Sequence, residues 1–210
     1  LFPFIDWATF CWLPVKTAHE SRNPHLSASF GQFMFFRRES YLAIGGHAEI
    51  RGNHLDDFEL GRATKRLGMK WMLFAGPNSV KVRAYKGNID AFTAISRSLF
   101  PALDYRVSVL ALLSIVLLGL GFLPPLTLLF GNLSHPEETA SLLVAIASIG
   151  MIATPWLIVC RKFKHNALLS LLYPLSIGLM VIVAFHSLAT HAFGITNWKG
   201  RRLTERRVRL

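Results

Sequence analysis

Cysteine and acidic residues are both scarce in this chain. The 210 residues include two cysteines, Cys11 and Cys160, which lie far apart in the sequence and indicate neither a disulfide framework nor a zinc site. Sparse cysteine usage fits a reducing compartment. Asp and Glu number 12 against 23 Lys and Arg, so the net charge is +11. The sequence also lacks internal repeats, low-complexity tracts and a signal-peptide pattern.

The positive charge indicates a membrane rather than a nucleic acid as the partner. A basic chain can bind nucleic acid, but here the basic residues flank long apolar segments, and 52% of the residues are hydrophobic. That arrangement is typical of an integral membrane protein that faces anionic headgroups. We therefore expect no nucleic-acid partner. Because the chain begins at Leu1 rather than at a methionine, we expect a fragment whose N-terminal part is missing.

Three long apolar runs follow residue 106. They are Val107–Phe130, Ala140–Cys160 and Ala167–Phe193, and none of them contains a charged residue. Each exceeds the roughly 20 residues that a membrane-spanning helix needs. Pro124-Pro125 is expected to kink or end the first run.

The basic residues leave the membrane topology open. The link between the second and third runs is expected to face the cytosol because it contains Arg161, Lys162 and Lys164. The tail is also basic, so the same rule predicts that it faces the cytosol too. Three complete crossings would place the two on opposite sides. Either one run is re-entrant or interfacial, or the tail breaks the rule, and the Pro-Pro run is the first suspect.

Residues 1–18 are apolar and aromatic but too short to span a bilayer. An interfacial segment with Trp7 and Trp12 at headgroup depth is one interpretation. A buried core helix is an equally good one. Pro3 and Pro14 interrupt the segment.

Residues 19–106 are predicted to form an α/β layer, because predicted strands alternate with predicted helices. The strands are predicted at 33–36, 71–75 and 80–85, and the helices at 38–44, 56–67 and 89–103. Gly45-Gly46 is expected to end the first of these helices. In the helix 56–67, the predicted buried stripe consists of Leu60, Ala63, Thr64 and Leu67.

A carboxylate pair, Asp56 and Asp57, opens the helix predicted at 56–67. A carboxylate held at a helix start, just ahead of membrane segments, is suited to take a proton from a hydroxyl group. The helix dipole favours the ionised form of Asp57, whereas the charge of Asp56 opposes it. Acids at helix starts are common, so the alternative is that the pair only caps the helix.

Two motifs give this pair a context. One runs from Gly31-Gln32 through Arg37-Arg38-Glu39 to Gly45-Gly46-His47, and the other runs from Asp56-Asp57 to Gly68. With these motifs, residues 20–104 and the tail element Trp198-Lys199-Gly200-Arg201 resemble the second half of a membrane-bound family 2 glycosyltransferase. Ceramide glucosyltransferase, cellulose synthase and the hopanoid- or carotenoid-associated enzymes share this layout. In such enzymes the second acid is the catalytic base, which maps to Asp57, and Asp56 stands where many relatives have Glu.

The resemblance implies a fold and a reaction. The fold would be an α/β, Rossmann-like GT-A domain, of which 19–106 is the C-terminal part. An interfacial segment (1–18) would precede it, and membrane helices (107–193) and a basic tail (194–210) would follow. The reaction would be inverting transfer of a sugar from a nucleotide-sugar to a lipid-type acceptor. It would take place at the cytosolic face of a membrane, such as a bacterial inner membrane. Relatives use a divalent metal, Mg²⁺ or Mn²⁺, at an Asp-x-Asp motif that this chain lacks, so we expect the metal ligands outside it.

The resemblance also assigns residues to substrate binding. Gly31 and Gln32 would line the acceptor or sugar pocket, and the alternative is a bulge with a surface glutamine. Arg97 and Arg201 would contact the diphosphate, and the alternative is snorkelling to lipid headgroups. The whole expected set is Asp56, Gly31, Gln32, Arg97, Arg201 and Trp198.

Two other functions remain open at this point. One is a polysaccharide synthase, which the absence of a Gln-x-x-Arg-Trp motif disfavours; Arg97 falls where processive relatives carry that motif. The other is a non-catalytic membrane anchor or scaffold subunit. An anchor predicts no carboxylate facing a cleft, and it would be favoured if Asp57 were buried against structural donors without an adjoining cavity.

Overall fold

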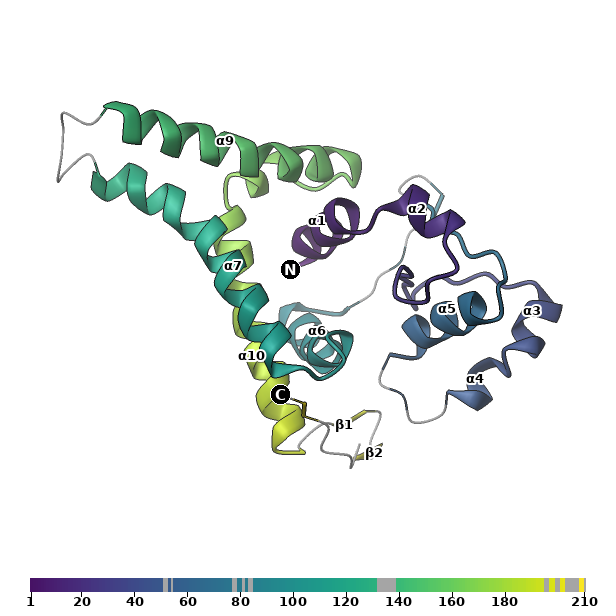
Figure 1. Ribbon diagram of the computed structural model, residues 1–210. Helices are drawn as coiled ribbons and strands as arrows, with labels where there is room; N and C mark the ends of the chain where they lie inside the picture. The colour runs from purple at the N-terminus through teal and green to yellow at the C-terminus, as the bar shows by residue number, and fades with distance from the viewer. Residues whose placement is uncertain are drawn as a thin grey trace.

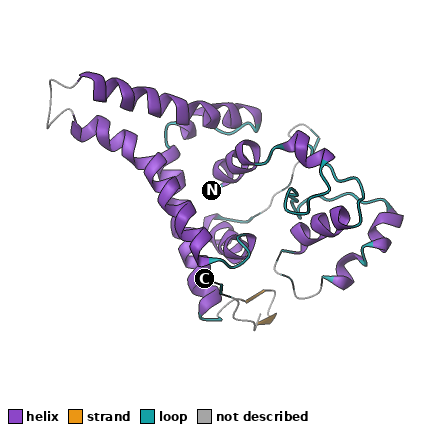
Figure 2. Cartoon of the chain, in the orientation of Figure 1, coloured by secondary structure: helices purple, strands orange, loops and turns teal. Residues whose placement is uncertain are grey.

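The computed structural model is helical (Figures 1 and 2), and most of the residues that it describes lie in helices. It describes residues 1–50, 53, 55–76, 79–80, 82, 85–131, 139–194, 197–198, 201–202 and 208–209. The helices are α1 (Phe2–Trp12), α2 (Val15–Glu20), α3 (Arg38–Ala43), α4 (Gly46–Glu49), α5 (Asp56–Arg66), α6 (Asn88–Ala102), α7 (Val107–Leu126), η1 (Thr127–Gly131), α9 (Thr139–Lys162), η2 (Ala167–Ser170) and α10 (Tyr173–Ala192). Two short strands, β1 (Asn197–Trp198) and β2 (Arg201–Arg202), pair antiparallel in the tail.

The predicted α/β, Rossmann-like layer is therefore wrong. Within the described part of 19–106 there is no strand. The run 33–36 was predicted as a buried strand, but Phe33 is 64% exposed and Phe35 is 87% exposed. Residues 71–76 do not pair with a neighbouring strand, and the Leu73 N–H instead donates to Nε2 of His19 at 3.1 Å. A short apolar run does not show whether the chain offers a partner strand elsewhere, so the strands predicted from these runs were wrong. The third predicted strand lies partly outside the described residues.

The predicted helices of the same region are confirmed as α3, α5 and α6. Gly45 has φ 74°, a left-handed conformation that glycine adopts without steric cost, and it separates α3 from α4. Acidic side chains lie in the first turn of α5 and Lys65 and Arg66 lie in its last turn, which matches the helix dipole.

The buried face of α5 is rotated from the predicted stripe. Leu60 and Thr64 are buried as expected, but Leu67 is 55% exposed and Lys65 is buried in its place. The Lys65 ammonium donates to the carbonyls of Ala18 and, at 2.9 Å, of Ser21, at the end of α2. It also lies 4.8 Å from the centre of the Trp71 ring. A lysine stem that covers apolar surface while its ammonium caps a helix end explains the exchange.

The N-terminal segment forms helix α1, which has one packed and one exposed face, and its interfacial position stays a prediction. One face is packed: Phe4 is 7% exposed, and the Trp7 ring stacks on Trp156 of α9 with centroids 5.1 Å apart. The other face leaves Phe10 and Trp12 exposed. Pro3 lies in the first turn of α1, where its missing N–H costs nothing.

Three helices are long and apolar enough to cross a membrane, namely 107–130, 140–162 and 173–192. Pro124 and Pro125 do not end the first of them. Both prolines lie inside α7, which ends at Leu126 and continues directly into the π-helix η1. The chain is thus a membrane protein in composition and in structure.

Helix α10 packs antiparallel along α7, while α9 pairs with the far end of α7 (Figure 1). A Cβ on Gly121 of α7 would lie 3.0 Å from Ile177 of α10, and Leu110 clusters with Ala184. Small residues at such positions allow close helix approach in membranes. Helix α1 fills the angle between α9 and α10, where Phe4, Trp156 and Ile177 share one apolar cluster.

Candidate functional site

Asp57 lies in the first turn of α5 and its two carboxylate oxygens accept different backbone donors. Oδ2 accepts the N–H of Gly31 at 2.8 Å, and Oδ1 accepts the N–H of Phe58 at 2.8 Å. The first bond joins α5 to a loop 26 residues away, so it fixes the orientation of the carboxyl group. Each oxygen retains a lone pair for a further hydrogen bond.

Burial raises the pKa of the Asp57 carboxyl above the ordinary 3.8, and it outweighs the other contributions. The N–H groups of Gly31 and Phe58 oppose this shift because they stabilise the ionised form, while the charge of Asp56 adds to it. The sequence-based expectation for the Asp57 pKa considered only the helix dipole and the charge of Asp56, and so omitted burial, which is the largest cause. A carboxyl group with a raised pKa is a better proton acceptor once ionised.

Gly31 is in direct contact with this carboxyl group. A Cβ at residue 31 would lie 3.3 Å from Asp57 Oδ2 and 3.5 Å from its Cβ, tighter than ordinary van der Waals contact at the oxygen. The close approach predicted for Gly31 is therefore made to Asp57 itself. Gln32, in the same turn, is exposed, as are its two neighbours. The Asp56 side chain accepts the N–H of Asp57 at 3.0 Å.

Tyr85 lies where the charges of Asp57, Asp90 and Arg97 all act. Burial raises the pKa of the Tyr85 phenol, the positive charge of Arg97 lowers it, and the negative charges of Asp90 and Asp57 raise it further. The Tyr85 ring also stacks on Phe2 of α1, with centroids 5.7 Å apart. From the sequence, Tyr85 was predicted only as part of a strand. Its nearness to Asp57 depends on how distant segments fold together, which no local sequence pattern predicts.

The remaining expected residues, Trp198 and Arg201, belong to the tail. They face each other in the register of β1 and β2. The structure describes their backbone but not their side chains, so their predicted contacts with substrate remain predictions.

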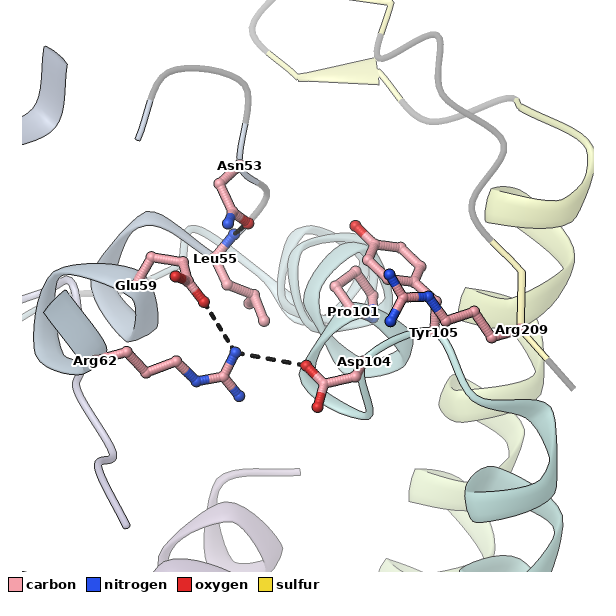
Figure 3. Close-up of a pocket in the computed structure, with 8 residues that line it drawn as sticks. All are labelled: Asn53, Leu55, Glu59, Arg62, Pro101, Asp104, Tyr105 and Arg209. Carbon is pink, nitrogen blue, oxygen red and sulfur yellow. Dashed lines mark hydrogen bonds and ion pairs between the residues drawn. The ribbon is translucent and has the colours of Figure 1, made fainter. Parts of the chain in front are cut away.

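One cavity lies between α5, the end of α6 and residue 209 (Figure 3). The Arg62 guanidinium reaches from α5 to Glu59 at 2.8 Å and to Asp104 at 3.4 Å, and Pro101 and Tyr105 form the opposite wall. Backbone bonds at 2.7 and 2.8 Å hold Arg209 between Tyr105 and Val107. A second cavity lies between α7 and α9. Asp57 lines neither of these two cavities.

The implied Mg²⁺ or Mn²⁺ has no matching ligand set here. Among the residues that the structure describes, no three His, Cys, Asp or Glu side chains are grouped as metal ligands. Divalent cations of this kind prefer several oxygen ligands around one point. The residues present therefore do not fit the ion, and no step of a reaction is assigned to it.

Neither a protein-family model nor a curated protein nor a solved structure matches the chain.

Proposed function

We propose that the chain is part of an inverting glycosyltransferase that moves a sugar from a nucleotide-sugar to a lipid-type acceptor at the membrane. The observation that carries the proposal is the partly buried Asp57 carboxyl, which is oriented by Gly31 and whose charge, like that of Arg97, acts on the Tyr85 phenol. The resemblance of the surrounding motifs to family 2 glycosyltransferases supplies the reaction class.

In the proposed reaction, Asp57 takes the proton of the acceptor hydroxyl as its oxygen attacks the anomeric carbon. The bond from that carbon to the nucleotide diphosphate breaks at the same time, and the diphosphate leaves with the electron pair. A cation stabilises the developing negative charge, and we assign this role to the half-buried Arg97, whose charge acts on the same Tyr85 phenol as that of Asp57. Attack from the face opposite the leaving group inverts the configuration of the sugar.

Helix α1 supports a lipid-type acceptor, because it connects the carboxyl group with the membrane helices. At one end Phe2 stacks on Tyr85, and two residues later Phe4 packs against Trp156 of α9. An acceptor whose tail lies among the membrane helices would reach the Asp57 region along this aromatic path. A water-soluble acceptor would not need this aromatic path.

The test uses the protein in its native membranes with radiolabelled nucleotide-sugars. Asp57→Asn is expected to reduce transfer by about 10²–10⁴-fold, the usual contribution of a positioned general base, while binding of the labelled donor persists. Glu20→Gln, an exposed acid on α2, is the matched control and is expected to leave transfer unchanged. Undiminished turnover in Asp57→Asn would remove Asp57 from the chemistry.

The second candidate is a membrane anchor or scaffold subunit, and one observation favours it. Both Asp57 oxygens are engaged by backbone donors and neither of the two cavities includes this residue, as expected for a structural helix cap. An anchor predicts that Asp57→Asn changes stability but no transfer reaction. Thermal unfolding of the same variant, measured beside transfer, separates the two functions.

A further inference from the structure

We propose that the cavity between α5, the end of α6 and residue 209 binds a neutral, hydroxyl-rich ring, namely a single sugar unit (Figure 3). The cavity is separate from the candidate base, because Asp57 does not line it. The inference concerns binding alone, so it stands or falls independently of glycosyl transfer.

The charges around the cavity balance. Glu59 and Asp104 contribute two carboxylates, and Arg62 and Arg209 contribute two guanidinium groups. Arg62 Nη1 contacts both acids, at 2.8 Å from Glu59 and 3.4 Å from Asp104. Arg66 also contacts Glu59, but it does not line the cavity. A diphosphate would face the two carboxylates and a metal cation would face the two guanidinium groups, so like charge opposes either ligand. A neutral ligand meets no such repulsion.

The polar side chains of the cavity retain hydrogen-bonding capacity. Arg62 Nε is buried and has no acceptor within the part of the chain that the structure describes. Asp104 uses Oδ1 for its long contact with Arg62, and among the described residues its Oδ2 accepts no hydrogen bond. The Asn53 side-chain oxygen accepts the N–H of Leu55 at 3.2 Å, which leaves the Asn53 NH₂ group to donate. Because a hydroxyl group both donates and accepts, a ring with several hydroxyl groups suits this mixture.

The size and the walls of the cavity suit one ring. Its volume is about 140 Å³. Since an apolar cavity of about 150 Å³ holds a benzene ring, there is room for one six-membered ring but not for a nucleotide. Leu55, Pro101 and Tyr105 supply apolar surface beside the polar groups, a combination that is common in small-molecule sites. The C–H faces of a sugar would lie on this surface, and its hydroxyl groups would bond to Asp104 and Arg62.

The backbone at Asp104 is one that glycine would adopt more easily. Asp104 has φ 52° and Tyr105 has φ 62°, both in the left-handed region. The N–H of Asp104 donates to the Pro101 carbonyl at 3.0 Å and the N–H of Tyr105 donates to the Phe100 carbonyl at 3.3 Å. This hydrogen-bond pattern ends many helices, usually with glycine at the position that Asp104 occupies. An aspartate there adds a carboxylate to the cavity at the cost of backbone strain, and such strain is often found at ligand sites.

The test uses the intact chain in a detergent without a sugar headgroup, such as lauryldimethylamine oxide, because an alkyl glycoside detergent would compete for the cavity. Saturation-transfer NMR is recorded with the methyl glycosides of glucose, galactose, mannose and N-acetylglucosamine. At least one of the four is expected to bind. The octyl glycoside of the same sugar then distinguishes the two sources of such a ring. Stronger displacement of the methyl glycoside by the octyl compound indicates a glycolipid headgroup, and equal displacement indicates a free sugar.

Asp104→Gly separates binding from folding. The variant is expected to weaken glycoside binding by about tenfold or more, because it removes a charged hydrogen-bond acceptor. Its thermal unfolding is expected to stay in place or to move to higher temperature, because glycine adopts a positive φ without steric cost. Glu39→Gln, an exposed acid on α3, is the matched control and is expected to bind as the wild-type chain does.

Absence of binding for all four glycosides would overturn the inference, and so would unchanged affinity in Asp104→Gly. Displacement of the glycoside by an equal concentration of inorganic phosphate would show a preference for an anion and would contradict a neutral ligand. If Asp104→Gly does not fold, Arg209→Ala decides. The backbone of Arg209 bonds to Tyr105 and Val107, whereas its exposed side chain lines the cavity. Weaker binding in Arg209→Ala supports the site, and unchanged binding refutes it.

Discussion

Helices α2–α5 and the membrane helices α7–α10 are held together by different forces. Around α5, single polar contacts join distant segments: Lys65 bonds to the end of α2, Asp57 to Gly31, and Arg62 to Asp104. Among the membrane helices the contacts are mainly apolar, centred on fully buried Trp156 and Tyr173. The first region is fixed by directional bonds and the second by close packing.

This difference explains where functional chemistry can reside. A carboxyl group needs a fixed orientation and a tuned pKa to take a proton, and directional bonds provide both. Packing of apolar side chains provides neither, but it tolerates contact with lipid on its outer face. The proposed site thus lies in the region that directional bonds fix, and contact with lipid is left to the region that apolar packing fixes.

The largest expected effect comes from a cavity in the packed region. Trp156→Ala removes a fully buried indole between α1, α9 and α10, and is expected to lower the free energy of unfolding by about 3–5 kcal/mol. Met151→Ala on the same helix is the control, because Met151 is 77% exposed. Thermal unfolding in detergent micelles measures both. Equal losses for the two variants would mean that packing at Trp156 is not what holds α9.

A smaller effect is expected from the buried lysine of the polar region. Lys65→Met keeps the apolar stem but leaves the carbonyls of Ala18 and Ser21 without their donor, at a cost of about 1–3 kcal/mol. Exposed Lys70→Met is the control. Limited proteolysis sharpens the comparison: new cleavage is expected near α2 and α5, with α7–α10 still protected. Simultaneous loss of protection in both regions would show one cooperative unit instead of two.

Much of the membrane region was predictable from the sequence because burial in lipid leaves a local mark. Each uncharged run became a long helix, and the ends of α7 and α9 were placed within a few residues. The neighbours of α10 were not predicted, because its polar contacts with Ser96 and Phe100 come from another helix.

In the polar region, helices were predictable and strands were not. Acids, glycines and periodicity define a helix within its own sequence, as in α5. A strand needs a partner elsewhere in the chain, and residues 71–76 have none within the part that the structure describes. For the candidate site, motifs singled out Asp57 and Gly31 separately, but the hydrogen bond between them was not predicted. The neighbourhood of Tyr85 was not predicted either, since it arises only when α1 and α5 are folded together.

The smallest expected effect tests the electrostatics of Asp57 and assumes the proposed transfer reaction. Because burial raises the pKa of Asp57 above 3.8, the ionised base forms only at higher pH, and the transfer rate is expected to rise with pH through that raised pKa. The folded state also holds this proton over the same window, so this group's contribution to stability falls as pH rises there. Asp56→Asn removes a negative neighbour that helps to raise the pKa, and should shift the acidic limb of the rate profile to lower pH. A pH–rate profile of both proteins measures the shift; a limb that stays in place, or moves upward, would show that the charge of Asp56 does not act on the group that titrates.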